Sequence, residues 1–298
     1  MKILSFGSLN VDYVYKVAHI VRKGETISAV SRHIYAGGKG LNQSIAMARA
    51  GLTVFHAGCI GPGGEFLLDT LHAEGIDTEY IGFLPDVPVG HTVIQNSADG
   101  DNCIILFGGA NQAVTDAQIN EVLACFEKGD YIVLQNEISC LNRLIDLAYA
   151  KGMHIVLNPS PISEEIFSLD LRKTDYLFVN EIEAAALTGV DETNHDLLTE
   201  RLAEMLPETE ILLTLGEKGA FSIRNRQKVF QPAFKVQAVD TTAAGDTFTG
   251  FYLGGIISGM STQAALEYAS KAASIAVTRS GAVPSIPLRK EVVGDTFH

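Results

Sequence analysis

Basic residues are scarce in this chain. Its 298 residues include 22 lysines and arginines against 35 acidic residues, for a formal net charge of −13 at pH 7. The basic residues form no run, whereas a surface that binds nucleic acid needs a basic patch or stripe. We therefore expect no nucleic-acid partner, and an anionic substrate would need a local positive site.

The sequence also lacks a long apolar segment. The uncharged, mainly apolar stretch around residues 248–260 is rich in glycine and too short to cross a bilayer. Asp12 follows the first residue too closely for a signal peptide. We expect a cytoplasmic protein with no membrane partner.

Cysteines are few and widely spaced. They stand at Cys59, Cys103, Cys125 and Cys140, with no Cys-x-x-Cys pair. This spacing is typical of reduced, buried thiols and not of disulfides or a zinc site. The length and a hydrophobic content of 47% fit one large domain with an appendage better than two equal domains.

Short apolar runs alternate with helical patterns along most of the chain. We expect strands at residues 3–6, 54–59, 131–134, 154–157, 176–179 and 211–215. Helices are expected at residues 41–50, 65–74, 116–126, 141–150, 181–188 and 197–206. Most of the strands are apolar without alternation, as in parallel sheets covered on both faces. With right-handed crossovers, this order predicts an α/β fold with three layers, α/β/α, around a mainly parallel sheet.

Two segments interrupt this order. Residues 11–35 and 89–107 carry alternating patterns, with strand-like runs at 26–30 and 92–95 and a turn at 98–101. We expect them to form one small antiparallel sheet, a lid, beside a main domain of residues 1–10, 36–88 and 108–298. Such a sheet cannot bury both faces itself, so it closes over a site or pairs with a second subunit. We predict a homodimer through the lid; a surface excursion without a role is the alternative.

The most informative motif spans residues 239–250, where a loop of small residues enters a helix. The first turn of a helix has unpaired N–H groups and a partial positive charge, so it can hold an anion. Ala243, Ala244 and Gly245 leave room for close approach, and Asp246 is expected one residue inside the helix, near a transferring phosphoryl group. An aspartate that only stabilises the helix start is the alternative.

Two further clusters offer polar groups. Asn10 and Asp12 lie two residues apart after the first strand, so they share a face and suit vicinal hydroxyls; an Asn/Asp turn would also explain them. In residues 37–42 the glycines permit close approach, Lys39 adds a charge and Asn42 faces back from the first helical turn; a glycine hinge is the alternative. Neither cluster fits a dinucleotide fingerprint or a Walker loop.

Residues 37–42 and 240–250 together resemble the two signature motifs of the ribokinase-like, phosphofructokinase-B type family of carbohydrate kinases. The similarity continues over almost the whole chain, at residues 7–12, 109–111, 158–161, 180–183, 214–219 and 276–285. The resemblance implies an ATP-dependent kinase that phosphorylates a primary hydroxyl of a small sugar, with D-ribose as the expected substrate. The alternatives are a related kinase for a nucleoside, fructose or deoxyribose, and a sugar-binding regulator that does not catalyse.

The resemblance also implies roles for single residues. Asp246 would be the general base, and the backbone amides of Ala243, Ala244 and Gly245 would form an anion hole. The sugar would be held by Asn10, Asp12, Gly38, Lys39, Asn42 and Glu137. ATP, with hydrated Mg²⁺, would be held by Asn180, Glu183, Thr214, Gly216, Gly219 and Ser270, the last at a position where we anticipate asparagine. A K⁺ ion would be held by Asp240, Thr242, Ala276, Arg279, Gly281 and Ser285.

Some of these residues have simpler interpretations when taken alone. Glu137 fits a solvated loop acid, Asn180 and Glu183 fit the start of a helix, and Asp240 fits a carboxylate that caps a turn. The chain also departs from the family pattern at residues 61–65, Gly-Pro-Gly-Gly-Glu, where an Asp-containing turn is usual. Because proline fixes the backbone, we expect this loop, and not the phosphoryl-transfer residues, to differ.

Overall fold

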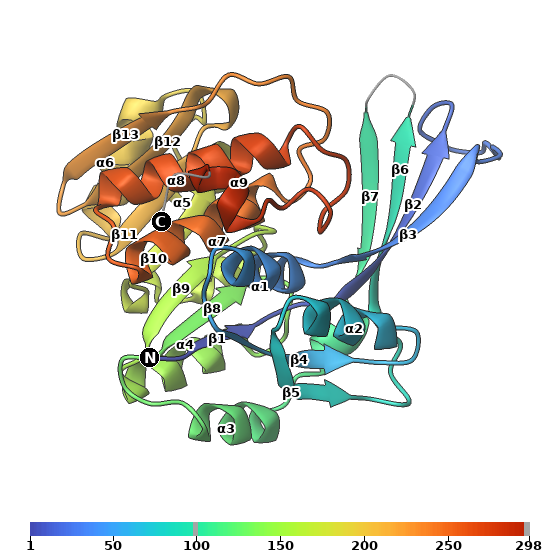
Figure 1. Cartoon of the computed structure of the whole chain (residues 1–298), viewed down its shortest axis with the longest axis horizontal. Coiled ribbons are helices and arrows are strands. Elements are labelled where there is room, and N and C mark those ends of the chain that lie inside the picture. The colour runs from blue at the N-terminus through green and yellow to red at the C-terminus, as the bar shows by residue number, and fades with distance from the viewer. Residues whose placement is uncertain (98–100, 295–298) are drawn as a thin grey trace.

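The structure, a computed structural model, describes residues 1–97 and 101–294. Its main sheet has the strand order β13-β12-β11-β10-β9-β8-β1-β4-β5 (Figure 1). All neighbours from β5 to β11 pair in parallel, and β12 and β13 add an antiparallel edge. The strands are β1 (Ile3–Phe6), β4 (Val54–Ile60), β5 (Asp77–Phe83), β8 (Tyr131–Gln135), β9 (His154–Asn158), β10 (Tyr176–Asn180), β11 (Glu210–Thr214), β12 (Gly219–Arg224) and β13 (Gln227–Pro232).

Helices cover both faces of this sheet, which confirms the predicted three layers (Figure 1). One layer contains α1 (Lys39–Arg49), α2 (Glu65–Ala73), α7 (Ala244–Ile257), α8 (Thr262–Ala276) and α9 (Arg289–Val293). The other contains α3 (Asp116–Ala124), α4 (Leu141–Lys151), α5 (Glu181–Thr188) and α6 (His195–Met205). Short 3₁₀ turns are η1 (Gly109–Ala113), η2 (Glu164–Ser168), η3 (Leu171–Lys173) and η4 (Gly216–Lys218).

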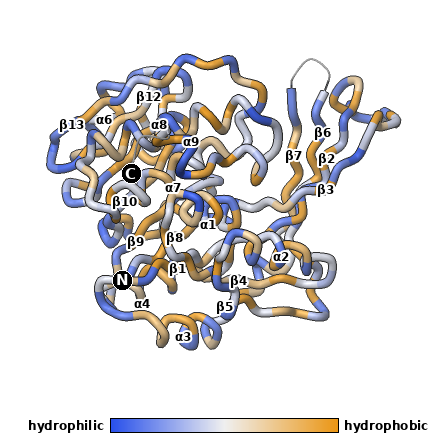
Figure 2. The backbone as a smooth tube through the Cα atoms, viewed as in Figure 1, coloured by the Kyte–Doolittle hydropathy of each residue, from blue (hydrophilic) through white to orange (hydrophobic). Residues whose placement is uncertain are grey.

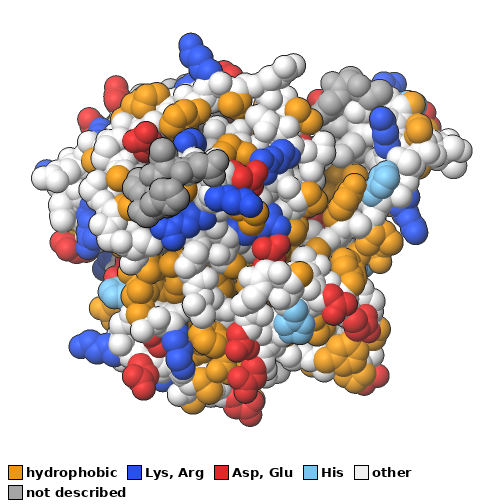
Figure 3. Space-filling model, viewed as in Figure 1, with side chains coloured by type: hydrophobic (Ala, Val, Ile, Leu, Met, Phe, Trp, Pro, Cys, Tyr) orange, Lys and Arg blue, Asp and Glu red, His pale blue; other side chains and the backbone are white. Residues whose placement is uncertain are grey.

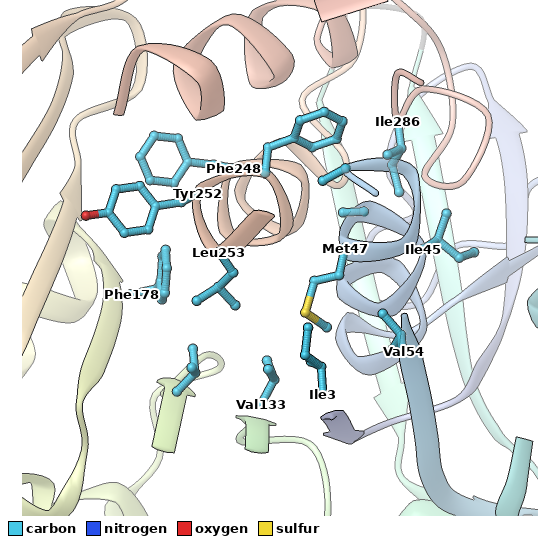
Figure 4. Close-up of a cluster of buried hydrophobic side chains, with 14 of the residues drawn as sticks. Ile3, Ile45, Met47, Val54, Val133, Phe178, Phe248, Tyr252, Leu253 and Ile286 are labelled. Atoms are coloured by element: carbon cyan, nitrogen blue, oxygen red, sulfur yellow. The ribbon is translucent and has the colours of Figure 1, made fainter. Parts of the chain in front are cut away.

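The central strands are apolar on both sides because each side supports its own hydrophobic core. In β8, Ile132 belongs to the core under α3 and α4, while Val133 belongs to the core under α1 and α7. Figure 2 shows these strands as a hydrophobic centre of the fold. Figure 4 shows Phe248 and Tyr252 of α7 near Phe178 of β10, and both rings meet Phe178 edge-on.

Helices α1 and α7 pack in direct contact through small residues. A Cβ on Gly250 would lie 2.4 Å from the Cβ of Ala46, and one on Gly254 would lie 2.6 Å from the Cβ of Ala50. Only glycine fits at these two positions, because larger residues would force the helices apart. The close packing places the first turns of α1 and α7, both rich in predicted site residues, side by side.

A second sheet projects from the main body, with the strand order β3-β2-β6-β7 (Figure 1). We call these four strands the lid: β2 (Asn10–Val17), β3 (Ser31–Gly37), β6 (Gly90–Ser97) and β7 (Asn102–Phe107). The outer pairs are antiparallel as expected, whereas the central pair, β2 with β6, is parallel. The lid is therefore a mixed sheet, because β2 and β6 both leave the main body at the same end of the lid.

The strand-like run at residues 26–30 does not form a strand. The ladder between β2 and β3 ends where Lys16 pairs with Ser31, so residues 26–30 have no place in the ladder. The predicted turn at residues 98–101 lies largely outside the described residues, since 98–100 are not described. The departure at residues 61–65 forms a tight turn, closed by a bond from Gly64 N to Gly61 O, which packs against Val89 at the base of the lid.

Every residue of β7 is exposed, and four are large and apolar. The exposed fractions are 56% for Ile104 and 61% for Ile105, and Leu106 and Phe107 are nearly half exposed. β7 is also the outer strand of the lid. Figure 3 shows apolar side chains on the lid and beside it. A free sheet edge with such residues is an unusual surface for an isolated subunit.

The four cysteines are free, as predicted, but only Cys59 is buried. The prediction of burial is wrong for Cys103, which lies on the exposed β7, and for Cys125 and Cys140, which lie at the ends of helices. Across residues 1–97 and 101–294, none of the helices combines the length and the apolar character needed to cross a membrane.

Candidate functional site

Eight of the predicted site residues gather at the carboxyl ends of the parallel strands, as expected for a sheet of this type. A cleft of about 430 Å³ opens there. It lies between the ends of β9, β10 and β11 and the first turns of α1, α5 and α7. The predicted residues that line it are Lys39, Asn180, Glu183, Thr214, Gly216, Ala243, Gly245 and Asp246.

Asp246 lies at the bottom of this cleft, in the third position of α7 and not the second. The helix begins after Ala243, whose φ of 59° gives the sharp entry. Asp246 is 6% exposed, and both of its oxygens accept hydrogen bonds from α1. Asn42 Nδ2 donates to Oδ2 at 3.1 Å, and Gln43 Nε2 donates to Oδ1 at 3.0 Å.

The amides at the start of α7 are only partly available for an anion. The N–H of Ala244 already donates to the carbonyl of Thr241 at 3.2 Å, because the left-handed Ala243 closes a tight turn. Gly245 faces open space: a Cβ built on it would have nothing within 4 Å. Of the three predicted residues, Gly245 therefore offers the closest approach to a phosphate.

Lys39 brings a positive charge into the cleft. Burial disfavours its charged form, but nearby carboxylates outweigh this and raise the pKa of Lys39 above its ordinary value. The carboxylates belong to Asp246, Glu137 and Glu183. Lys39 thus lies between the predicted sugar residues and the predicted nucleotide residues, and it supplies the local positive site that the acidic chain needs.

Glu137 is a partly buried, hydrogen-bonded acid and not a solvated loop residue. Its Oε2 accepts hydrogen bonds from Ser8 Oγ and, at 3.1 Å, from the backbone N–H of Lys39. Burial raises the pKa of Glu137, while the charge of Lys39 and these hydrogen bonds oppose the rise. Glu137 therefore links the loop after β8 to the start of α1.

Asn10 and Asp12 lie at the base of the lid. Asn10 is buried, and its Oδ1 accepts a hydrogen bond of 2.7 Å from Asn111 Nδ2. Asp12 Oδ1 accepts one of 2.6 Å from Thr92 Oγ1 of β6. Burial raises the pKa of Asp12 to about 6; the bond from Thr92 opposes the rise and the charge of Glu137 adds to it.

Gly38 gives the backbone the turn that brings the predicted sugar residues together. Its φ of 95° favours glycine, and a Cβ there would lie 3.0 Å from both Asn10 N and Ser8 O. Its carbonyl accepts a hydrogen bond from the N–H of Asn42 at 3.0 Å, which begins α1. The predicted sugar residues are therefore neighbours in space, around the start of α1.

The predicted nucleotide residues divide into two groups. Asn180 and Glu183 form a capping box at the start of α5, with bonds of 2.8 and 2.9 Å, and they line the cleft together with Thr214 and Gly216. The structure does not bring Gly219 or Ser270 to the cleft lining. Gly219 is required by packing, since a Cβ there would lie 2.2 Å from Gln231 O of β13, and Ser270 is buried in α8.

The predicted cation loop is brought together around Asp240. Its Oδ1 accepts bonds from Thr242 N and Oγ1, at 2.9 and 2.6 Å, and its Oδ2 accepts one from Gly281 N at 2.8 Å. These bonds outweigh the effect of burial and hold the pKa of Asp240 below its ordinary value. The N–H of Arg279 donates to Ala276 O, and Ser285 Oγ donates to Ala282 O in the adjoining turn.

The carboxylate of Asp240 and the hydroxyl of Thr242 offer hard oxygens, the donor type that suits a hard cation. The residues described, 1–97 and 101–294, contain no cluster of three or more His, Cys, Asp or Glu side chains able to hold a metal ion. A Mg²⁺ ion that keeps its waters and binds substrate phosphates does not need such a cluster.

Sequence reasoning missed several residues that hold the site together. Gln43 binds Asp246, Ser8 binds Glu137 and Asn111 binds Asn10. Each stands beside or within a motif that the sequence singles out, but polar residue type alone does not tell a ligand contact from a supporting bond. Thr92 had no such signal, because its pairing with Asp12 depends on the parallel register of β2 and β6.

Comparison with known proteins agrees with this architecture. The model of the pfkB family carbohydrate kinases matches residues 1–289. A ribokinase of Haemophilus influenzae is 34% identical over 296 residues, which cover 96% of this chain and 95% of that protein.

Solved structures are also similar over nearly the whole chain. The ribokinase of Cryptococcus neoformans var. grubii serotype A in complex with ADP has a TM-score of 0.87 at 33% identity, covering 98% of both chains. The ribokinase of Arabidopsis thaliana complexed with ribose and ATP has a TM-score of 0.86 at 29% identity, covering 98% of this chain and 97% of that one. The chain therefore belongs to the pfkB family of carbohydrate kinases.

Proposed function

We propose that this chain transfers the γ-phosphate of ATP to the 5-hydroxyl of D-ribose, giving ribose 5-phosphate and ADP. The observation that carries the proposal is the contact between Asn42 and Asp246, which joins a predicted sugar residue to the predicted base inside the cleft. The relatives named ribokinase, one of them complexed with ribose and ATP, support the choice of sugar.

In this mechanism Asp246 takes the proton of the 5-hydroxyl as that oxygen forms a bond to the γ-phosphorus. The bond from the γ-phosphorus to the oxygen of the β-phosphate breaks, and ADP leaves. Phosphoryl transfer depends mainly on positioning and charge stabilisation, so the carboxylate need not be a strong base. Lys39 and the open amide of Gly245 are suited to the charge on the transferring group.

Magnesium is part of the proposal. Asn180 and Glu183, at the cleft wall, would hold ATP phosphates with hydrated Mg²⁺, and the ion would offset the phosphate charge. Glu183 keeps one carboxylate oxygen outside the capping box, since Oε2 alone accepts the bond from Asn180. Use of ATP fits the cytoplasmic location that we also propose.

Release of ADP tests the function. We expect kcat/KM to be higher with D-ribose than with 2-deoxy-D-ribose, D-fructose or a nucleoside. A higher value for one of the other acceptors would make the proposed sugar wrong. Binding of sugar and ATP with no release of ADP above the sugar-free rate would instead indicate a sugar-binding regulator.

Sugar affinity should depend on pH through Asp12. A carboxylate whose pKa is raised to about 6 is protonated as the pH falls below 6, and it then loses acceptors for sugar hydroxyls. If only the ionised form binds, the Kd for the sugar rises about tenfold at pH 5. Titration calorimetry from pH 5 to 7.5 measures this, and Asp12→Asn should flatten the curve in that range. An unchanged wild-type Kd at pH 5 contradicts the role of Asp12.

We also propose that K⁺ binds around Asp240 and supports the nearby start of α7. The ion would set the geometry of this loop without touching the sugar. Replacing K⁺ by Na⁺ at constant ionic strength should lower kcat. An equal rate in both salts removes this part of the proposal.

The exposed β7 supports a homodimer through the lid. Pairing of two lids would cover Ile104 and Ile105, which are more than half exposed in the single chain. Ile105→Lys should shift the sedimentation profile towards the monomer. A wild-type mass that stays monomeric at all concentrations contradicts the dimer.

A further inference from the structure

Two buried amides connect the main sheet to Asp246. Gln135 is the last residue of β8, Gln43 lies in the first turns of α1, and both are fully buried. Gln135 Nε2 donates to Gln43 Oε1 at 2.8 Å, and Gln43 Nε2 donates to Asp246 Oδ1 at 3.0 Å. A continuous chain of hydrogen bonds therefore runs from the sheet to the carboxylate.

Each donor in this chain of hydrogen bonds points the same way, from Gln135 to Gln43 and from Gln43 to Asp246. An amide side chain has an acceptor on one side and two donors on the other. If the Gln43 amide were reversed, its oxygen would face the carboxylate of Asp246 and its NH₂ would face the NH₂ of Gln135. Both contacts would be unfavourable, so the Gln43 amide turns its NH₂ to the carboxylate and its oxygen to Gln135. The Oε1 of Gln135 has no hydrogen-bond partner among the described residues.

The fold leaves room for the Gln135 side chain to reach from β8 to α1. A Cβ on Gly7 would lie 2.2 Å from Gln135 Oε1 and 2.7 Å from the Cα of Gly40. Glycine at these two positions lets the Gln135 side chain pass between the end of β1 and the start of α1. A side chain at Gly7 would displace the amide, so the passage depends on this local sequence.

Asn42 and Gln43 hold the two oxygens of Asp246 in different ways. Asn42 Oδ1 is buried and has no partner within residues 1–97 and 101–294, so Asn42 can also face the sugar. The oxygen of Gln43 accepts a hydrogen bond from Gln135, and its nitrogen donates one to Asp246. Gln43 can therefore act on the reaction only through the carboxylate.

We propose that Gln135 and Gln43 form a positioning relay that aims the Asp246 carboxylate at the sugar hydroxyl. The inference rests on the proposed function, in which Asp246 is the general base. Because α1 donates a hydrogen bond to each of its two oxygens, the carboxylate is held against rotation, and each oxygen keeps one lone pair for the substrate. Gln43 and Gln135 are positioning residues and do not touch the sugar.

Gln43→Met tests the relay because methionine keeps the length and removes the donor. We expect kcat to fall about 10- to 100-fold, as for a misplaced reacting group, with the KM values for sugar and ATP within about twofold. A loss of general structure in the site would instead raise these KM values as kcat falls. The charged groups that act on Asp246, Lys39 and Glu137, are unchanged in the variant.

A double-mutant cycle with Gln135→Met separates a relay from two independent residues. We expect Gln135→Met to lower kcat less than Gln43→Met, and the double variant to lose no more than Gln43→Met alone. Losses that multiply would overturn the relay. Gln118→Met is the matched control, since Gln118 is a part-buried glutamine that binds Gly58 O, and it should leave kcat unchanged.

Calorimetric binding of the sugar shows which variants are folded. If Gln43→Met fails to bind, Gln135→Met decides: a kcat equal to that of the wild type in that variant overturns the relay. The proposed function fails separately, when the wild type releases no ADP or Asp246→Asn remains active. If the wild type is active and needs Asp246, and Gln43→Met keeps the wild-type kcat, then only the relay is wrong.

Discussion

Asp246→Asn is expected to lower kcat by about 10³- to 10⁴-fold, while sugar and ATP still bind. Asparagine has the size of aspartate and can still accept a hydrogen bond from α1, but it cannot take the proton of the attacking hydroxyl. Because the lost interaction belongs to the transition state, kcat and kcat/KM should fall together. Steady-state release of ADP, with calorimetric binding of both substrates, measures the effect.

Asp116→Asn is the matched control for this experiment. Asp116 lies in the first turn of α3, where an acid also stabilises a helix start, but far in the sequence from the cleft residues. If Asp246 only stabilised α7, the two variants would behave alike. A variant at Asp246 with near-normal turnover would show that the general base lies elsewhere.

Lys39→Met is expected to give the second largest loss, about 10²- to 10³-fold in kcat. Lys39 is the cation that lines the cleft beside Asp246 and Glu183, and its raised pKa keeps it charged. Its charge is suited to the transferring phosphoryl group, where negative charge must be stabilised without water. The KM for ATP should rise less than kcat falls. Lys39→Arg, which keeps the charge, should recover part of the rate.

The resemblance assigns Lys39 to the sugar, and the kinetics distinguish the two roles. If Lys39 binds mainly the sugar, Lys39→Met will raise the KM for the sugar and leave kcat nearly intact. If Lys39 stabilises the phosphoryl group, Lys39→Met will lower kcat and change the KM for the sugar little. Its backbone N–H binds Glu137 in either case, so the side chain alone is tested.

The layers of the fold could be predicted because burial on both faces leaves a clear pattern in the sequence. The middle of β8, residues 131–134, and the middle of β11, residues 211–213, are unbroken apolar runs, as expected for strands covered on both faces. β13 was missed because it is an edge strand, Gln227–Pro232, with mostly exposed side chains and no apolar run. The parallel pairing of β2 with β6 depends on contacts between segments some 80 residues apart in the sequence, which no local pattern encodes.

The site was predictable in its motifs and not in its internal bonds. Small residues before Asp246 follow from the physics of helix starts, and the structure keeps this arrangement with a left-handed Ala243. That the N–H of Ala244 is already bonded depends on how the loop before α7 folds back. That Ser270 does not line the cleft depends on the packing of α8. Gln43 is beside Asn42 in the chain, yet only the packing of α1 on α7 reveals that both meet one carboxylate.

The contact between α1 and α7 also suggests where this protein can be engineered. The groups around Asp246 stand on two helices fixed by Gly250 against Ala46, so few substitutions there will be tolerated. Asp12 and Thr92, by contrast, belong to the lid, a separate sheet that does not contain α1 or α7. Acceptance of new sugars should therefore be easier to select by varying the lid, with the phosphoryl-transfer chemistry left as it is.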